Sequence, residues 1–401
     1  NFKSFIEGFK DALFSVDSVK KSPLIKKPSA PFTTSTMQQE ASRKLGFNVS
    51  RTMQTAQKLY EAGHITYMRT DSVTLSETAL NSIHSTISSK YGSEYSQRRS
   101  FSNKSRNAQQ AHEAVRPTNF DVNISNLDSD QSNLYDLIWR RTLASQMSDA
   151  KVDKTTVKIV SNNHDGFFQS VGEVIKFDGF LRLYRESKDN QKNDDSENTV
   201  LPNIFEGDIV EKENVLVTQF FTKPPFRFTE ASLVKKLEEL GIGRPSTYAP
   251  TITTVMNRKY VFKGLNNAQS RDIIEYTIDT EVNKTVKSEK YGSNKGKLVP
   301  SEVGLLVNEF LTNNFKNIID YNFTASVESE FDSIANGSKD WKSIIHKFYD
   351  PFSSVVEDVQ KNAKRETGER ILGVDPKSGR QLSVKLGKYG PIAQIGKVDE
   401  E

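Results

Sequence analysis

The sequence predicts an α+β protein of several domains. Its 401 residues are long enough for two to four domains with cores of their own. Residues 151–183 alternate apolar and polar side chains in the manner of strands, with a turn at 162–166. The order helix, turn, helix and strand occurs twice, over 33–70 and 229–262, which is the outline of a winged-helix-like module. We therefore expect two helical modules of this kind beside a β-rich part.

The composition excludes several classes of site but does not name a function. With 55 Lys+Arg against 51 Asp+Glu the chain is only mildly basic, so its net charge does not indicate nucleic-acid binding. Residues 32–120 are more positive, with eleven basic against six acidic side chains. The lack of cysteine excludes disulfides and thiolate zinc sites. No apolar run approaches the roughly 18 residues of a membrane span, and no signal peptide opens the chain, so we expect a soluble cytoplasmic protein.

The first 70 residues are predicted to hold a strand, a connector and the first helical module. Alternating apolar side chains predict a strand over 13–19. Residues 20–31 are basic and interrupted by prolines, which predicts an extended connector, lying either near a phosphate backbone or in solvent as an ordinary linker. Helical spacing predicts one helix over 33–46, ended by a glycine, and a second helix capped by Ser50. The apolar face of this second helix is expected to consist of Met53, Ala56, Leu59 and Tyr60. A strand over 65–70 follows.

Two side chains of that strand point to a possible reaction. Tyr67 and Arg69 are two residues apart, so in an extended segment both face the same space. A tyrosine hydroxyl, with a pKa of about 10, attacks only when a neighbour removes its proton or stabilises the charge that forms. A guanidinium is permanently charged and its fork fits two oxygens of one phosphate. The pair indicates phosphoryl transfer to a phenol, but a strand tyrosine beside a surface arginine is more common, and spacing alone does not decide.

Three further features precede residue 150. Residues 74–77 fit the capping box of a helix, whose positive N-terminal end would suit a nearby phosphate. His112 lies just before a proline, and a lone histidine is more often structural than catalytic, which nothing local decides. Asp128 and Asp130 form an Asp-x-Asp pair of the kind that can hold a divalent cation. No apolar strand precedes this pair, so we expect one aspartate to cap the following helix instead.

The second module has side chains that suit binding to a single nucleic-acid strand. Arg227 and Arg244 can contact phosphates. Ser246, as a helix cap, and Thr247 add hydroxyl and amide donors at a helix start. Tyr248 offers a face on which a base can stack. The same run is equally consistent with a tight turn followed by a capped helix. Before this module, the acidic run 186–198 is expected to be disordered.

Four long motifs follow one another in a fixed order. They are Leu59-Tyr-Glu-Ala-Gly-His-Ile-Thr-Tyr-Met-Arg-Thr-Asp-Ser72, Gln110-Ala-His-Glu-Ala-Val-Arg-Pro117, Phe221-Thr-Lys-Pro-Pro-Phe-Arg-Phe-Thr-Glu-Ala-Ser232 and Gly241-Ile-Gly-Arg-Pro-Ser-Thr-Tyr248. In this order they resemble the motifs of type IA DNA topoisomerases of the bacterial topoisomerase I kind. The resemblance extends from about residue 15 to the C-terminus.

The resemblance implies a division into domains. Residues 1–31 and 149–222 would form a β-rich arch or gate domain, and 32–148 the winged-helix-like domain of the catalytic tyrosine. Residues 223–365 would form the helical single-strand-binding domain. Residues 366–401 resemble the start of a cysteine-free C-terminal repeat, as a DNA-binding accessory or a β-rich cap. No stretch matches the family's magnesium-binding toprim domain, so we expect a fragment without that domain and without a metal site of its own.

The resemblance also implies a reaction. Tyr67 would attack one DNA strand and form a 5′-phosphotyrosyl bond, which keeps the energy of the broken link, so that no ATP is needed. Arg69 would hold the phosphate oxygens, His112 would support the site, and Arg116 would contact a phosphate. The parent enzyme would use Mg²⁺ and relax negatively supercoiled DNA as a monomer associated with the nucleoid. The fragment is expected to bind single-stranded DNA without relaxing plasmids.

One alternative from another class remains. The chain could be a DNA-binding module that uses its winged-helix surfaces without any chemistry. The presence of both Tyr67 and Arg69 argues against it, because a module that only binds has no need of that pair.

Overall fold

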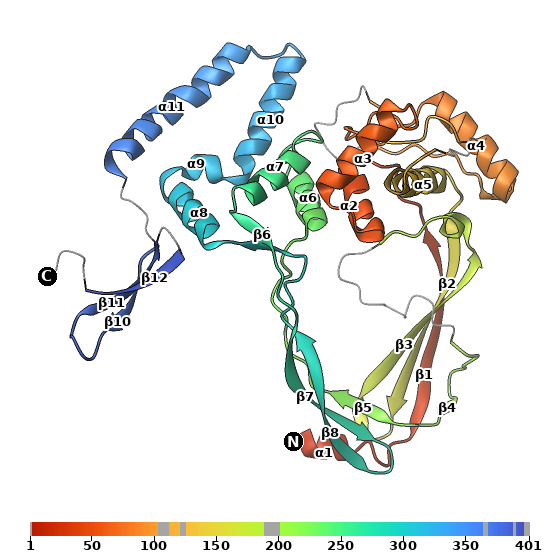
Figure 1. Ribbon diagram of the computed structural model, residues 1–401. Helices are drawn as coiled ribbons and strands as arrows, with labels where there is room; N and C mark the ends of the chain where they lie inside the picture. The colour runs from red at the N-terminus through yellow and green to blue at the C-terminus, as the bar shows by residue number, and fades with distance from the viewer. Residues whose placement is uncertain are drawn as a thin grey trace. The chain divides into compact units, whose positions relative to one another are not determined.

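The computed structural model describes residues 2–102, 112–120, 126–187, 201–363, 368–387 and 390–396, and its course is drawn in Figure 1. The chain forms two compact units. The first contains the described residues up to 227 together with 265–295, and the second contains 228–264 and the described residues from 296 onward. Helices and antiparallel sheets occur in both, which confirms the α+β class. In the part of the chain that is described, no helix is long and apolar enough to cross a membrane.

A four-stranded sheet is the largest of the first unit. It has the antiparallel order β3-β2-β1-β4, and its strands are β1 (Phe14–Lys26), β2 (Ala150–Ser161), β3 (His164–Phe177) and β4 (Ile209–Val210). The strand predicted over 13–19 therefore continues to Lys26, through half of the expected connector. Pro23 is tolerated there because β1 pairs with β4 only at Phe14 and Ser15, which leaves one edge of β1 free of ladder hydrogen bonds at the proline.

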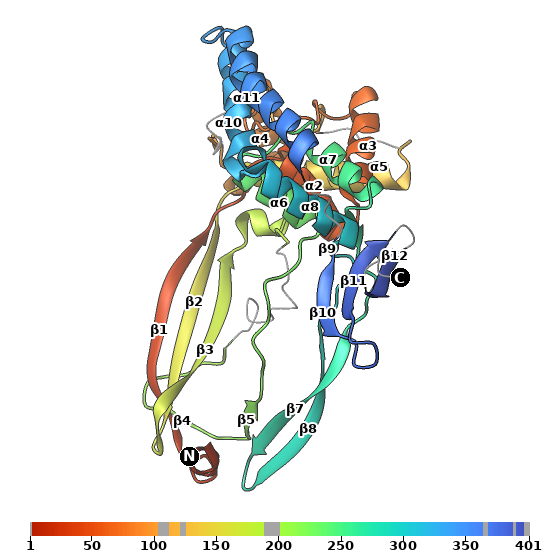
Figure 2. The same cartoon turned by 90° about the vertical axis from the view of Figure 1, so that its left-hand side faces the viewer.

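A second sheet of the first unit was not anticipated from the sequence. It has the order β5-β7-β8, with β5 (Val215–Thr218), β7 (Gln269–Ile278) and β8 (Val282–Tyr291). Helix α1 (Phe2–Glu7) lies at the end of β1, near β5, in Figure 2. A small apolar cluster joins these elements: Ile6, Phe9, Ala12, Phe14, Val215 and Ile278. The 265–295 segment thus belongs to the first unit, although its residues fall within the range expected for one helical domain.

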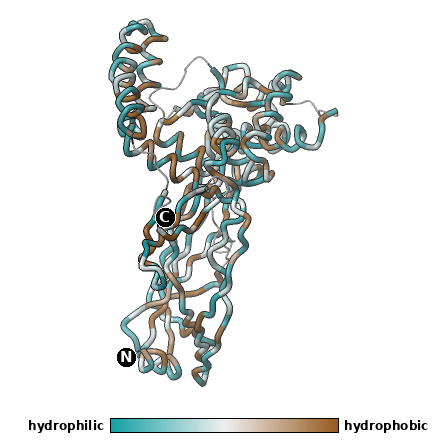
Figure 3. Tube along the Cα trace, turned by 60° about the vertical axis from the view of Figure 1, so that its left-hand side comes forward, coloured by the Kyte–Doolittle hydropathy of each residue, from teal (hydrophilic) through white to brown (hydrophobic). Residues whose placement is uncertain are grey.

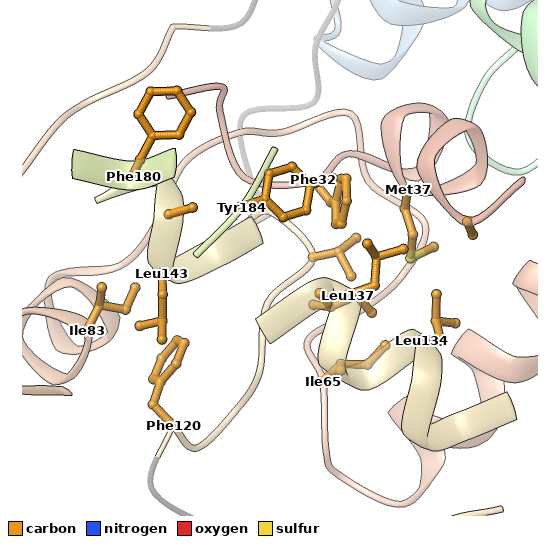
Figure 4. Packing of buried hydrophobic residues seen from close by; sticks show 14 of the residues in the cluster. Phe32, Met37, Ile65, Ile83, Phe120, Leu134, Leu137, Leu143, Phe180 and Tyr184 are labelled. Carbon is orange, nitrogen blue, oxygen red and sulfur yellow. The ribbon is translucent and has the colours of Figure 1, made fainter. Parts of the chain in front are cut away.

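The larger core of the first unit lies among its helices. These are α2 (Thr34–Leu45), α3 (Val49–Glu61), α4 (Glu77–Tyr91) and α5 (Ser129–Ser145), with short 3-10 turns η1 (Ser93–Tyr95) and η2 (Gly179–Arg182). Figure 4 shows Phe32, Met37 and Leu137 in this core, together with Phe180 and Tyr184 from the segment after β3. The core therefore joins the helices to the end of the large sheet.

The ends of these helices test the predicted caps. Gly46 ends α2 with φ +67°, a left-handed conformation that favours glycine, as predicted. Asp128 caps α5 through a capping box, which confirms the cap expected from the Asp-x-Asp pair. The cap predicted at Ser50 is wrong, because Asn48 accepts the hydrogen bond from the Arg51 N–H and α3 begins two residues earlier.

The second unit begins with the helix, turn, helix and strand that the sequence predicts. Helices α6 (Glu230–Glu239) and α7 (Tyr248–Asn257) precede β6 (Val261–Lys263), which pairs with β9 (Leu298–Pro300). Four helices follow: α8 (Glu302–Asn314), α9 (Lys316–Ile319), α10 (Tyr321–Ala335) and α11 (Trp341–Asn362). Both hydrophilic (teal) and hydrophobic (brown) residues occur along the helices in Figure 3, and Ile344 of α11 is buried.

The tail forms a small antiparallel sheet in the second unit. Its order is β10-β11-β12, with β10 (Arg370–Val374), β11 (Gln381–Gly387) and β12 (Gly390–Ile395). The acidic run expected to be disordered at 186–198 falls almost wholly outside the described residues, which stop at 187 and resume at 201.

Candidate active site

The segment that carries Tyr67 is not a strand. Its backbone makes one isolated bridge, between Ile65 and Pro117, so the strand predicted over 65–70 is wrong. The predicted alternation of side chains is nevertheless present over 67–70, where Tyr67 is 36% exposed and Arg69 is exposed, while Met68 and Thr70 are buried; Ile65, which would share the side of Tyr67, is buried and departs from it. The segment keeps this alternation without a neighbouring strand because other groups bind its backbone.

Two threonine hydroxyls bind the backbone on either side of Tyr67. The Thr34 hydroxyl, at the start of α2, donates to the Met68 carbonyl at 2.7 Å and accepts the Thr70 N–H at 2.8 Å. The Thr34 N–H donates to the Thr70 carbonyl, also at 2.8 Å. On the other side, the Thr66 hydroxyl donates to the Ala114 carbonyl at 2.7 Å, and the Thr66 N–H donates to the Arg116 carbonyl at 2.9 Å. The backbone at Tyr67 is thus fixed from both directions.

The phenol ring of Tyr67 has two other rings as neighbours. Tyr60 of α3 meets it edge to face, with ring centroids 5.2 Å apart and planes at 66°. The His112 ring is 6.1 Å away on a tilt of 37°. The sequence predicts Tyr60 to lie on the apolar face of its helix, but its side chain is 40% exposed because Ala56 and Leu59 fill that face.

The two reactive groups of this segment, the Tyr67 hydroxyl and the Arg69 guanidinium, are both without a bonding partner among the described residues. Neither forms a hydrogen bond or an ion pair within those ranges. The two groups therefore retain their hydrogen-bonding capacity for a ligand, and a guanidinium in this state can bind two phosphate oxygens.

Arg116, by contrast, is already bound. Its guanidinium Nε donates to the Glu113 carboxylate at 2.9 Å, and another nitrogen donates to the Pro117 carbonyl at 2.9 Å. Glu113 also accepts the N–H of Ser76, the residue that caps α4. Burial raises the pKa of Glu113, but the hydrogen bond from Ser76 and the charge of Arg116 outweigh it, so that the pKa lies below its usual value.

Glu113 was not identified from the sequence as the partner of Arg116. The signal that could have found it is its position three residues before the arginine. Glu113 ties the Arg116 side chain to the start of α4. The cap predicted within 74–77 is wrong in detail, because Ser76 caps α4 and the Thr74 hydroxyl instead bonds the hydroxyl of Ser72. The N-terminus of α4 still follows the Tyr67 segment closely along the chain, as the sequence predicts.

The structure gives no support to a metal site near the Asp-x-Asp pair. Asp128 accepts the Gln131 N–H at 2.8 Å, and both oxygens of Asp130 accept hydrogen bonds from Arg51 at 2.7 Å. No group of three or more His, Asp or Glu side chains could hold a metal ion in the portion of the chain that is described. Asp128 and Asp130 therefore do not fit a magnesium site.

The side chains expected to bind a single strand are divided between the two units. Arg227 is exposed at the end of the first unit. In the second unit, Arg244 donates to Asp332 at 3.0 Å and lies 3.6 Å from Glu328, and its backbone N–H donates to the Thr247 hydroxyl at 2.8 Å. These contacts fix the turn that leads into α7.

Two predictions for this turn need correction. Tyr248 does not offer a stacking face, because its side chain is only 7% exposed and packs inside the second unit at the first turn of α7. Ser246 is not the cap, because α7 begins after Thr247, whose hydroxyl instead binds the backbone of Arg244. Both hydroxyl residues remain exposed.

Comparisons with known proteins agree with the motifs. A family model described as DNA topoisomerase matches residues 1–273 and 275–346. The prokaryotic-type DNA topoisomerase 1 of Acanthamoeba polyphaga mimivirus is 41% identical over 406 residues, covering 95% of this chain and 47% of the relative. DNA topoisomerase 1 of Xylella fastidiosa strain Temecula1 is 42% identical over 394 residues, covering 94% and 44%. The chain thus spans about half the length of these curated relatives.

A solved structure is also similar. The full-length topoisomerase I from Thermotoga maritima superimposes with a TM-score of 0.75 at 30% sequence identity. The match covers 99% of this chain and 62% of that protein.

The charged contacts of Glu113 predict a pH-dependent contribution to stability. Because the folded pKa lies below the unfolded value, the ionised carboxylate stabilises the fold above about pH 4.3 and loses this effect as the pH falls through the folded pKa. Glu113→Gln should therefore lower the free energy of unfolding by about 1 kcal/mol at pH 7. Urea unfolding of both proteins should show this difference shrinking below pH 4.

The matched control is Glu61→Gln, which changes an exposed carboxylate at the end of α3 that is bonded only to Gln57. It should change stability little at any of these pH values. A difference between wild type and Glu113→Gln that stays the same from pH 7 to pH 3.5 would contradict the role given to the carboxylate.

Proposed function

The chain belongs to the type IA DNA topoisomerase family, and from this premise we propose that the protein carrying it is an ATP-independent isomerase that cuts and rejoins one DNA strand through Tyr67. One observation carries this proposal: an exposed tyrosine stands on a backbone fixed from both sides, two residues before an arginine, and neither its hydroxyl nor the guanidinium has a partner among the described residues. A nucleophile held in this way loses little freedom when it meets its substrate.

The proposed reaction is an exchange of phosphodiester partners. The Tyr67 hydroxyl oxygen bonds to the scissile phosphorus, and the bond from phosphorus to the 3′-oxygen of the neighbouring nucleotide breaks. The phenol loses a proton and the departing 3′-oxygen gains one, which leaves a 5′-phosphotyrosine and a 3′-hydroxyl. Attack by that hydroxyl reverses each change and rejoins the strand. The ester keeps the energy of the original link, so no ATP is consumed.

Arg69 and His112 have supporting roles in this proposal. Arg69 holds the non-bridging oxygens and stabilises the charge that develops in the transition state, an effect typically worth a few kcal/mol for one placed donor. His112 supports the site from its place beside the Tyr67 ring. Arg116 contacts a phosphate from the position in which Glu113 holds it.

No step of the proposed phosphodiester exchange passes through the magnesium ion that family membership implies. The described residues do not fit a site for it, since Asp128 caps a helix and Asp130 pairs with Arg51. We propose that the metal acts in the complete protein through residues other than these.

The proposed substrate is negatively supercoiled DNA in which a single strand is exposed. Arg227, Arg244, Ser246 and Thr247 are the proposed contacts to that strand, and Tyr248 is no longer among them. The exposure of both hydroxyl residues at the start of α7 supports this role. By family membership we expect the protein to act as a monomer, at the nucleoid in the cytoplasm.

The domain boundaries are likewise proposals. Residues 1–31 and 149–222 form the proposed arch, to which the β7–β8 hairpin contributes a sheet through the apolar cluster of α1 and β5. Residues 32–148 form the tyrosine domain. The remainder of 223–365 is the proposed single-strand-binding domain, and 366–401 the start of a C-terminal repeat.

We predict that Tyr67→Phe in the complete protein abolishes covalent attachment to DNA, because only the hydroxyl oxygen can form the ester. Single-strand binding should stay within about twofold of wild type, since the ring and its two ring contacts remain. The measurement is protein-linked labelled oligonucleotide after denaturation, beside a binding titration. Tyr135→Phe, in the same module, is the control and should keep the adduct. Adduct persisting in Tyr67→Phe would show that another residue is the nucleophile.

A second prediction concerns Arg244. Arg244→Ala should weaken binding to single-stranded DNA and lower the slope of log affinity against log salt by about 0.7, the share of one phosphate contact. The measurement is a filter-binding titration at four salt concentrations. Arg140→Ala, which also removes an ion-paired arginine, should leave the slope unchanged. An unchanged slope in Arg244→Ala would restrict its role to holding the turn before α7.

A third prediction concerns these 401 residues as a separate polypeptide. They contain the proposed nucleophile and proposed strand contacts, but the described part offers no acidic cluster beside them. We predict that this polypeptide binds single-stranded DNA in preference to duplex and does not relax a supercoiled plasmid, with or without Mg²⁺. Filter binding and plasmid relaxation on one preparation test both parts. Magnesium-dependent relaxation would point to ligands outside the described residues, or to Asp128 and Asp130 after rearrangement.

A further inference from the structure

Tyr60 has a feature that the proposed reaction does not explain. It is 40% exposed at the end of α3, where a polar side chain would be the ordinary choice. Its neighbours Ala56 and Leu59 already fill the core face of the helix, so Tyr60 is not needed there. Among the residues that the structure describes, the one ring that it meets is that of Tyr67, edge to face at 5.2 Å.

We propose that Tyr60 is a positioning residue, which holds the phenol ring of Tyr67 in the direction from which its hydroxyl attacks. This inference rests on the proposed function of Tyr67. Edge-to-face pairs are favoured because the positive edge of one ring meets the negative face of the other, and they restrict how the rings turn.

The ring contact with Tyr60 matters because the hydrogen bonds around Tyr67 hold its backbone and not its side chain. The hydrogen bonds of Thr34 and Thr66 fix the backbone, but they do not act on the side chain. The Tyr67 hydroxyl has no partner in the described ranges that would hold the ring from its far end. Among the described residues, the rings of Tyr60 and His112 lie beside the phenol and restrict its rotation about the two side-chain bonds. Of these two, Tyr60 is the closer.

Tyr60 is also well placed to act as a fixed support. It is the second-last residue of α3, and the backbone just beyond it is tied down, since the Gly63 N–H donates to the Tyr60 carbonyl at 2.8 Å. The following His64 N–H donates to the Leu59 carbonyl at 2.9 Å. Only six residues separate Tyr60 from Tyr67, and the buried side chains of Leu59 and Met68 anchor the chain to the core on either side of them.

The first test observes the ring itself and needs no activity. The chain is produced with 3-fluorotyrosine at its thirteen tyrosines, and the Tyr67 fluorine signal is identified as the one lost in Tyr67→Phe. Tyr60→Leu, which keeps an apolar side chain but removes the ring, should move this signal toward the position of free 3-fluorotyrosine. Tyr60→Phe should keep it near the wild-type position. Tyr91→Leu, a ring removed from the same module that contacts Tyr95 and not Tyr67, is the matched control.

The second test measures adduct formation in the complete protein at saturating single-stranded oligonucleotide. Tyr60→Leu should lower the rate constant about threefold to tenfold, the range expected for losing one aromatic pair. The oligonucleotide concentration for half-maximal rate should not change, and Tyr60→Phe should restore most of the lost rate. A mere loss of folding stability would not lower the rate constant in Tyr60→Leu, leave the half-maximal concentration unchanged and be reversed in Tyr60→Phe.

Two results would overturn the proposal. An unmoved Tyr67 signal in Tyr60→Leu would show that the contact does not hold the ring. A change confined to the half-maximal concentration, with the rate constant intact, would make Tyr60 a DNA contact instead. If wild type forms no adduct at all, the proposed function of Tyr67 fails, while the fluorine signal still decides whether Tyr60 positions the ring.

Discussion

The geometry of the site depends on the hydroxyl of Thr34. This fully buried group is at once part of the first turn of α2 and a partner of the Tyr67 segment, through the Met68 carbonyl and the Thr70 N–H. A buried carbonyl or N–H that loses its partner costs about 1–3 kcal/mol, so the segment is strongly held to the helix. The capping box at Thr33 fixes where α2 begins and therefore where Thr34 stands. The local start of a helix thus determines the position of the proposed nucleophile.

The helical module is in turn attached to the large sheet by buried polar groups. Arg141 of α5 is 3% exposed, and it donates to the Ala30 carbonyl at 2.6 Å and pairs with Glu186. Burial strongly raises the pKa of Tyr184, so this phenol stays protonated and donates to the buried Glu40 of α2 at 2.6 Å. Removing one partner of such a pair leaves a buried charge unpaired, which is strongly destabilising. The site is therefore held in register with the strands that precede and follow the module.

Patterns that depend on neighbouring residues were predictable, and those that depend on distant ones were not. Gly46 and Asp128 were found because a helix end is recognised within four residues. That Tyr67 and Arg69 share one side of the segment was predictable because residues two apart in an extended segment point the same way. The absence of a strand at that place was not, because the partners of its backbone are Thr34, Ala114 and Arg116, far away in sequence. Tyr60 and Tyr248 are both aromatic residues near a helix end, yet one is exposed and the other is buried. This difference follows from tertiary packing, which the local pattern does not contain.

The arginines proposed to meet phosphates differ in what they can contribute. Within the described ranges, Arg69 and Arg227 have no acidic partner, whereas Arg116 is paired with Glu113 and Arg244 with Asp332 and Glu328. A guanidinium already neutralised by carboxylates attracts a phosphate less, but it is held in one orientation and keeps donors for directed hydrogen bonds. An unpaired guanidinium exerts its full charge on a phosphate that approaches it. We therefore propose that Arg69, next to the proposed nucleophile, supplies the charge that assists bond breaking, and that Arg116 and Arg244 act through the fixed geometry that their carboxylates impose.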